Sequence, residues 1–264
     1  MQYKNIRFEK FNKVARITLS RPEVKNALNL LVLVEMGNAV EDVMRDDEIK
    51  SLVITGAGDT FSSGGDVDFV LNDLCPKSSI EIRGIIKKYY GKAVLSLRNL
   101  DKPVVGAING PALGAGFDLL LHFDIRIASE TATFGSIWVK VGIIPALGGM
   151  FLLPKIIGLG RASEMILTGD IIDAQEAFKI GLVNKVVPVE QLQEEVMDFA
   201  TRLSNGPPLA TSIAKQGINR SLSGHLSGEL DWAASMQSIC FKTEDCREGI
   251  MAFKERRKPK FQGK

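Results

Sequence analysis

Residues 102–118 read KPVVGAINGPALGAGFD, and this stretch carries most of the information about the fold. Val104–Ile108 is apolar and partly β-branched, which is typical of a short buried strand. It ends at Asn109-Gly110, a dipeptide that marks a turn. The glycines that follow allow the backbone to turn tightly before a helical stretch begins. The stretch therefore predicts a strand, a glycine-rich turn and a helix in direct succession.

The same order of elements is expected on both sides of this stretch. Val14–Leu19, Ser51–Thr55 and Asp124–Ala128 are further short apolar runs that predict strands. Apolar residues recur at helical spacing over Leu28–Met44 and Ile80–Leu97. Strands separated by helices favour parallel pairing, so the sequence predicts an α/β fold in which a strand–turn–helix unit recurs.

The chain changes character after about residue 188, where prolines punctuate a run without a clear strand. Helices are expected near 190–203, 209–222, 230–241 and 243–258. We predict two parts, a core over residues 1–195 and a helical C-terminal module over 196–264. Residues 253–264 hold six basic side chains, which form either a solvated charged end or a tail that contacts phosphate.

The composition excludes several classes of protein. The 264 residues carry a net charge of only +2, which argues against dedicated nucleic-acid binding. With 45% apolar residues the chain has enough apolar surface to fold. The N-terminus has no apolar signal core, and no apolar run reaches the roughly 18 residues that span a bilayer. Three cysteines do not make a full disulfide set, so we expect a reducing, cytoplasmic compartment.

A second glycine-rich turn, FSSGGDV at residues 61–67, also follows a predicted strand. Two such turns can each aim one backbone N–H at a single oxygen and so form an oxyanion hole. The alternative is that both are tight turns only. Neither turn is a phosphate loop, because no Gly-Lys-Ser/Thr follows, and the spacing of Gly110, Gly114 and Gly116 does not give the dinucleotide fingerprint.

Short motifs follow one another along nearly the whole chain. They are RP (21–22), NALN (26–29), FSSGGD (61–66), KPVVGAING (102–110), GAGFDL (114–119), DIRIA (124–128), FG (134–135), GIIP (142–145), LTG (167–169), GLV (181–183), EGIMAF (248–253) and RRKP (256–259). In this order they make the chain resemble the enoyl-CoA hydratase/isomerase (crotonase) family. The resemblance implies a β-β-α spiral core with a helical C-terminal trimerisation region. It also implies homotrimers or dimers of trimers, acyl-CoA substrates, and no separate cofactor, because coenzyme A is part of the substrate.

By motif position, the resemblance implies that the amides of Gly65 and Ala115 form the oxyanion hole. The thioester oxygen gains negative charge when the α carbon becomes enolate-like. Two preorganised amides stabilise that charge selectively in the transition state, and loss of one such donor typically costs about 3 kcal/mol.

The chain departs from the family pattern in its acidic residues. A family hydratase has two glutamates, and their positions hold Asp118 and Trp138 here. Related dienoyl isomerases and dehalogenases use an acid at the position of Ala146. The chain therefore lacks one acid of the pair that a family hydratase uses. It also lacks the acid that the dienoyl isomerases and the dehalogenases use. Asp118 is the one candidate acid/base left, with a structural aspartate bonded to a backbone amide as the alternative. Trp138 is interpreted as a pocket wall rather than a catalyst, since an indole exchanges no proton at neutral pH.

The resemblance also implies which residues bind coenzyme A. Lys25 and Ala27 would lie near the adenine, Ser63 and Val67 would border the thiol arm, and Phe253 and Arg256 would reach the nucleotide, often from a neighbouring subunit. Outside this set, Asp66 is expected to stabilise its loop and His122 and His225 to be structural. Cys240 and Cys246 are expected to be buried thiols, and no His/Cys cluster has metal-ligand spacing.

The sequence therefore predicts an acyl-CoA enzyme that stabilises a thioester enolate and uses Asp118 as its single acid/base. Double-bond migration and a specialised hydration both fit a single acid. The rival hypothesis is an acyl-CoA or acyl-carrier binding protein that kept the fold and lost turnover. RNA binding is disfavoured by the charge of +2.

Overall fold

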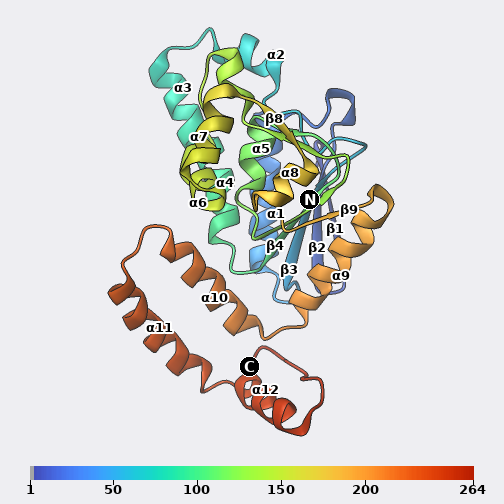
Figure 1. Ribbon diagram of the computed structural model, residues 1–264, viewed down its shortest axis with the longest axis vertical. Coiled ribbons are helices and arrows are strands. Elements are labelled where there is room, and N and C mark those ends of the chain that lie inside the picture. The colour runs from blue at the N-terminus through green and yellow to red at the C-terminus, as the bar shows by residue number, and fades with distance from the viewer. Residues whose placement is uncertain (1–2) are drawn as a thin grey trace.

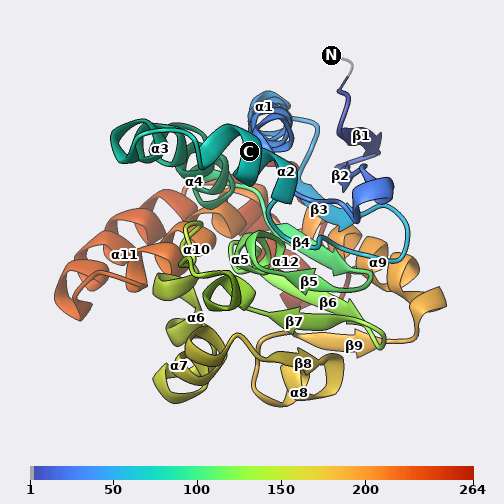
Figure 2. The same cartoon turned by 90° about the horizontal axis from the view of Figure 1, so that it is seen from above.

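A six-stranded sheet forms the centre of the computed structural model, which describes residues 3–264 (Figures 1 and 2). Its strand order is β1-β2-β3-β4-β6-β9. Neighbouring strands are parallel except for β1, which pairs with β2 in an antiparallel hairpin. The strands are β1 Ile6–Phe11, β2 Val14–Leu19, β3 Ser51–Gly56, β4 Val104–Ile108, β6 Ile125–Ser129 and β9 Lys185–Val187.

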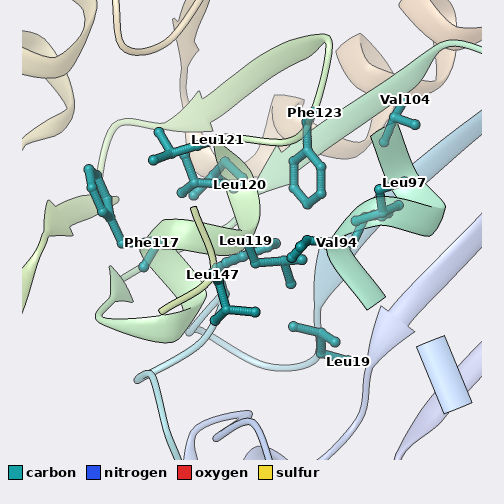
Figure 3. Close-up of a cluster of buried hydrophobic side chains, with 14 of the residues drawn as sticks. Leu19, Val94, Leu97, Val104, Phe117, Leu119, Leu120, Leu121, Phe123 and Leu147 are labelled. Atoms are coloured by element: carbon teal, nitrogen blue, oxygen red, sulfur yellow. The ribbon is translucent and has the colours of Figure 1, made fainter. Parts of the chain in front are cut away.

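Helices cover both faces of this sheet, and that explains why its central strands are almost wholly apolar. Val53, Val105 and Ile127 point to the face on which α9 (Leu192–Ser204) packs. Leu52 and Val104 point the other way and belong to the larger core on the opposite face. That core includes residues of α1 (Leu30–Arg45), α4 (Gly91–Asn99) and α5 (Ala115–Leu120). Figure 3 shows part of that core, including Leu119 and Leu147, whose backbones are important for the site below.

A second sheet, of three short strands, positions the segments that follow the strands of the six-stranded sheet. Its order is β5-β7-β8, with β5 (Ala112–Leu113) and β7 (Thr133–Gly135) parallel and β8 (Ile171–Asp173) antiparallel to β7. Because β5 leads directly into α5 (Ala115–Leu120) and β7 precedes the short helix η4 (Ile137–Val141), this sheet holds the starts of both segments together.

The predicted elements of the core are confirmed with small shifts. Helix α1 spans Leu30–Arg45, because the side chain of Asn29 accepts a hydrogen bond from the amide of Val32 and caps it. The helix predicted over 80–97 is divided into α3, a π-helical turn η3, and α4. Strand β1 was not predicted, because only Ile6 of its six residues is buried and the alternation is weak. The other helices of the core are η1 Pro22–Val24, α2 Val67–Phe69, η2 Val70–Leu74, α3 Ser79–Ile85, η3 Ile86–Tyr90, α4 Gly91–Asn99, α6 Gly149–Ile157, α7 Leu159–Thr168, α8 Ala174–Lys179 and η5 Val189–Gln191.

The C-terminal helices project away from the core (Figure 1). They are α10 (Pro208–Ser221), α11 (Leu226–Cys240) and α12 (Glu244–Glu255). The predicted boundary after residue 195 lies within α9, which packs on the sheet. Cys240 and Cys246, which flank the start of α12, are half-buried rather than buried as expected. No helix within residues 3–264 is both long and apolar enough to cross a membrane.

A buried ion pair attaches this projecting arm to the core. The ammonium of Lys215 on α10 lies 2.8 Å from a carboxylate oxygen of Asp124, just before β6, and donates to the carbonyl oxygen of Lys102 at 2.9 Å. Lys215 is buried, and burial lowers the pKa of its ammonium. Because a buried charge without its partner is costly, this contact holds α10 in one orientation against the core.

Candidate active site

The two glycine-rich turns lie against each other. The amide of Ser62 donates to the carbonyl oxygen of Pro111 at 3.0 Å, and the amide of Leu113 donates to the carbonyl oxygen of Ser62 at 3.0 Å. Gly64 has a φ of +112°. A Cβ atom there would lie 2.9 Å from the carbonyl oxygen of Leu113 and 3.5 Å from the amide nitrogen of Ala115. Only glycine suits that position, and the contact brings the two turns to one point.

The amides of Gly65 and Ala115 are both available at this point. The chain on either side of Gly65 is held by Leu28. The amide of Leu28 donates to the carbonyl oxygen of Gly64 at 2.7 Å, and the carbonyl oxygen of Leu28 accepts from the amide of Asp66 at 3.0 Å. Ala115 is the first residue of α5, so its N–H has no partner within the helix. Among the loop and turn hydrogen bonds of residues 3–264, neither amide donates to a protein oxygen.

A cavity of about 390 Å³ opens next to the two turns. Four residues that the sequence analysis assigned to the site, Ser63, Gly65, Val67 and Trp138, line it. The other lining side chains are apolar except for one thiol. Such a lining suits an apolar acyl chain and disfavours a charged group. The full lining is Ser63, Gly64, Gly65, Val67, Val70, Leu71, Cys75, Gly114, Ile137, Trp138, Val141 and Ile143.

The residues expected to bind coenzyme A are divided between two places. Lys25 lies beside the cavity, because its carbonyl oxygen accepts from the amide of Ser63 at 2.9 Å. Ala27 follows in the same turn, and the guanidinium of Arg21 holds its carbonyl oxygen at 2.8 Å. Phe253 and Arg256 are at the end of α12, which lies at the opposite end of the molecule from α2 (Figure 1). One chain therefore does not bring these two residues to its own cavity.

The Asp66 carboxylate has the structural role that the sequence predicted. Its Oδ2 pairs with Arg21 at 2.7 Å, and its Oδ1 accepts from the amide of Phe69 to cap α2. Burial acts to raise the pKa of Asp66, but these hydrogen bonds and the charge of Arg21 together outweigh it, so the pKa is lowered. Asp66 is therefore a fixed anion in the loop and not a proton carrier.

Asp118 is completely buried, with an exposed fraction of 0%. Burial raises its pKa from 3.8 to about 7. The backbone N–H groups of Leu147 and Gly149 and the indole of Trp138 act in the opposite direction, and Leu147 donates to Oδ2 at 3.3 Å. No second carboxylate within residues 3–264 is among the causes of the shift. A carboxyl with a pKa near neutrality is suited to accept and return a proton.

Asp118 and residues connected to it carry buried polar atoms without a hydrogen-bond partner. Five such side-chain atoms occur in residues 3–264, and four belong to Asp118 (Oδ1), His122 (Nδ1), Ser136 (Oγ) and Trp138 (Nε1). The Trp138 indole is close enough to lower the pKa of Asp118, yet neither Nε1 nor Oδ1 has a partner of good geometry. Because buried polar groups are rarely left unpaired, these atoms can form hydrogen bonds to a bound molecule or to water.

Sequence reasoning missed two parts of this site. The first is the segment Leu147–Gly149, whose amides reach the carboxylate; the pair Gly148-Gly149 was its only signal. The second is His122, which was expected to be a satisfied structural histidine. The structure buries it and gives Nε2 a partner, the carbonyl oxygen of Leu147 at 2.6 Å, but leaves Nδ1 without one.

Comparisons with known proteins agree with this fold. Residues 9–264 match the family described as enoyl-CoA hydratase/isomerase. The chain is 40% identical over 263 residues to a crotonyl-CoA hydratase of Syntrophomonas wolfei, covering 99% of each chain. It is 36% identical over 254 residues to a 1,2-epoxyphenylacetyl-CoA isomerase of Escherichia coli, covering 95% of each. The crystal structure of an enoyl-CoA hydratase from Bacillus anthracis superposes with a TM-score of 0.93 at 34% identity, covering 99% of this chain and 100% of that one.

The architecture is thus a crotonase fold with a helical C-terminal region. The chain belongs to the enoyl-CoA hydratase/isomerase family, and it is an acyl-CoA enzyme of that family. This confirms the family and the fold that the motifs indicated. The relatives carry both hydratase and isomerase names, so membership alone does not specify the reaction.

Proposed function

We propose that this enzyme acts on the carbon–carbon double bond of an acyl-CoA thioester, without a separate cofactor, through an enolate held by the amides of Gly65 and Ala115. Asp118 is its single proton carrier. The observation that carries the proposal is a buried carboxyl with a pKa of about 7 close to two apposed turns whose amides are free. Charge developing on the thioester oxygen would be stabilised where it forms, in surroundings that exclude water.

Trp138 connects the cavity to the acid in this proposal. Of the described residues, Trp138 lines the cavity and Asp118 does not. We infer that the indole of Trp138 moves when an acyl chain enters, so that the α carbon reaches the carboxyl. Its N–H is then free to donate to an oxygen at the β carbon, either of water or of a hydroxyl group. A hydration of this kind needs only one carboxyl, because the indole orients the oxygen and Asp118 moves the proton.

A panel of acyl-CoA thioesters tests the proposed function. Short and medium enoyl, dienoyl and β-hydroxy thioesters are incubated with the enzyme, and the products are identified by mass and by ultraviolet absorbance. Hydration adds the mass of water, whereas isomerisation leaves the mass unchanged. Tight binding of these thioesters in calorimetry without any turnover would favour the alternative, an acyl-CoA or acyl-carrier binding protein.

The variant Trp138→Phe tests whether the indole donates a hydrogen bond or only lines the cavity. The change keeps an aromatic ring and removes the N–H, so we expect kcat to fall about tenfold, the value of one lost hydrogen bond of about 1.4 kcal/mol. Because the indole lowers the pKa of Asp118, its loss should also move the acid limb of the kcat–pH profile upward. Trp232→Phe, which removes the other indole of the chain on α11, is the control. Unchanged kinetics in Trp138→Phe would leave the residue as a wall only.

Assembly into a homotrimer or a dimer of trimers is part of the same proposal. Leu226, Leu230 and Phe253 are exposed on α11 and α12, and Phe253 is 88% exposed. Apolar surface of this kind on a projecting arm is suited to contact another subunit. Such a contact would carry Phe253 and Arg256 toward a neighbouring cavity. Sedimentation equilibrium should give a multiple of three chains, and a stable active monomer would contradict this assembly.

A further inference from the structure

His122 and Asp118 hold the same peptide segment from two sides. Asp118 is in α5, and His122 follows four residues later in the turn that ends this helix, with its amide bonded to the carbonyl oxygen of Leu119 at 3.1 Å. The Leu147 amide donates to Oδ2 of Asp118, and the Leu147 carbonyl oxygen lies 2.6 Å from Nε2 of His122. One residue is therefore bonded through both ends of its backbone to one short stretch of chain.

The imidazole must donate in this contact. A carbonyl oxygen only accepts hydrogen bonds, so the proton is on Nε2 and Nδ1 is bare. Burial lowers the pKa of His122 to about 4, although the hydrogen bond to Leu147 acts in the opposite direction, and the charge of Arg98 on α4 adds to the effect of burial. The ring is therefore neutral at physiological pH, and Nε2 keeps its proton when the pH changes around neutrality.

The segment Leu147–Gly149 packs most tightly on the side of the carboxyl. A Cβ atom on Gly149 would lie 2.3 Å from Oδ1 of Asp118, so only glycine fits there. A Cβ atom on Gly148 would lie 3.4 Å from Nε2 of His122, which is ordinary van der Waals contact, so the imidazole packs directly against the same segment. A loss of the His122 contact would let the segment move away from the carboxyl that it faces.

We propose that His122 is a positioning residue that holds the Leu147–Gly149 segment against Asp118 and so aligns and tunes this carboxyl. The inference rests on the proposed role of Asp118 as proton carrier, but it concerns a residue outside that role. His122 does not touch the substrate in this proposal. It acts through the Leu147 peptide, whose amide stabilises the charged form of Asp118 when it is kept in place.

Three variants of His122 distinguish positioning from mere filling of space. Glutamine can place an amide donor near the position of Nε2, whereas asparagine can place one only near Nδ1, and leucine has no donor. We expect His122→Gln to retain most of the turnover. His122→Asn and His122→Leu should lose roughly 10- to 100-fold in kcat with little change in KM, as for a misaligned catalytic group. Exposed His225 supplies the control variant, His225→Leu, with parental kinetics.

A titration of Asp118 itself keeps this test independent of the proposed function. The infrared band of the protonated carboxyl, identified by its loss in Asp118→Asn, is followed with pH in each folded variant. His122→Leu and His122→Asn should shift the midpoint upward by roughly half a unit to one unit, because the charged form loses part of its stabilisation, while His122→Gln should not. A shift without any turnover on the panel would support the positioning role and contradict the proposed function.

Two results would overturn the inference. The first is equal midpoints and equal kcat in the parent, His122→Asn and His122→Leu. The second needs no variant: nitrogen-15 NMR of labelled histidine in the parent should show the proton on Nε2 and a bare Nδ1 between pH 6 and 9, and a protonated Nδ1 would exclude donation to Leu147.

Discussion

Asp118→Asn is expected to lower kcat by about 10²- to 10⁴-fold with KM nearly unchanged, since general acid–base help typically accelerates a reaction by that factor. The amide has the shape of the carboxyl but cannot take up a proton. Steady-state kinetics on the thioester that the parent converts fastest measure the effect. Full activity of this variant would remove Asp118 from the mechanism.

Neutralising a nearby exposed carboxyl is the matched control. Asp68 lies in α2, next to the cavity residue Val67, and is exposed to solvent. Asp68→Asn makes the same chemical change as Asp118→Asn and, because Asp118 is only partly ionised near neutral pH, removes at least as much negative charge. It should leave kcat, KM and the pH profile as in the parent, because a solvated charge at the surface is well screened. A similar loss in both variants would point to a general electrostatic effect and not to a specific proton carrier.

Asp118→Asn should also gain stability relative to the parent as the pH rises through a defined window. The pKa of Asp118 is about 7 in the folded chain, and its ordinary value is 3.8. Its neutral form is therefore favoured by folding, and the parent loses that contribution as the pH rises from about 4 to about 7. The difference in unfolding free energy between Asp118→Asn and the parent should grow across this range and stay constant above it. His122 is present in both proteins, so its own titration cancels from the comparison.

The motifs predicted the fold well because each combines a local signal with a long-range one. Val104–Ile108 is apolar on both sides since helices cover both faces of the sheet, and the structure has the same bounds. The start of α5 requires glycine for a reason that is visible only in three dimensions. A Cβ atom on Gly116 would lie 2.5 Å from Cβ of Ser62, a residue more than fifty positions earlier. The glycine pattern thus records a contact that the sequence alone does not identify.

The parts of the site that escaped prediction depend on distant backbone. His122 is one apolar-flanked histidine in LLLHFD, and nothing in that run indicates that its partner is the carbonyl oxygen of Leu147. The raised pKa of Asp118 follows from complete burial, which neighbouring residues suggest but do not establish. The free amides of Gly65 and Ala115 were inferred from motif position, and their availability depends on where all the other hydrogen bonds of the two turns are made.

Gly65→Pro should reduce kcat by at least 10²- to 10³-fold, the typical effect of one lost oxyanion-hole donor. Proline has no backbone N–H, so the change removes one of the two amides proposed to hold the enolate oxygen. Affinity for coenzyme A itself should persist in part, because Lys25 and Ala27 belong to a different turn. Single-turnover kinetics and calorimetry with a non-reactive acyl-CoA separate the two effects.

Gly65→Ala is the control that makes the proline result interpretable. No heavy atom lies within 4 Å of the position that a Cβ on Gly65 would take, and its φ is not positive, so alanine fits without strain. Alanine keeps the amide, and its methyl group is smaller than the proline ring. The two variants therefore differ chiefly in the N–H. A strong loss of kcat in Gly65→Pro with a modest loss in Gly65→Ala would assign the effect to the amide. Equal losses would assign it to crowding of the cavity. Parental turnover by a folded Gly65→Pro enzyme would exclude Gly65 from the oxyanion hole.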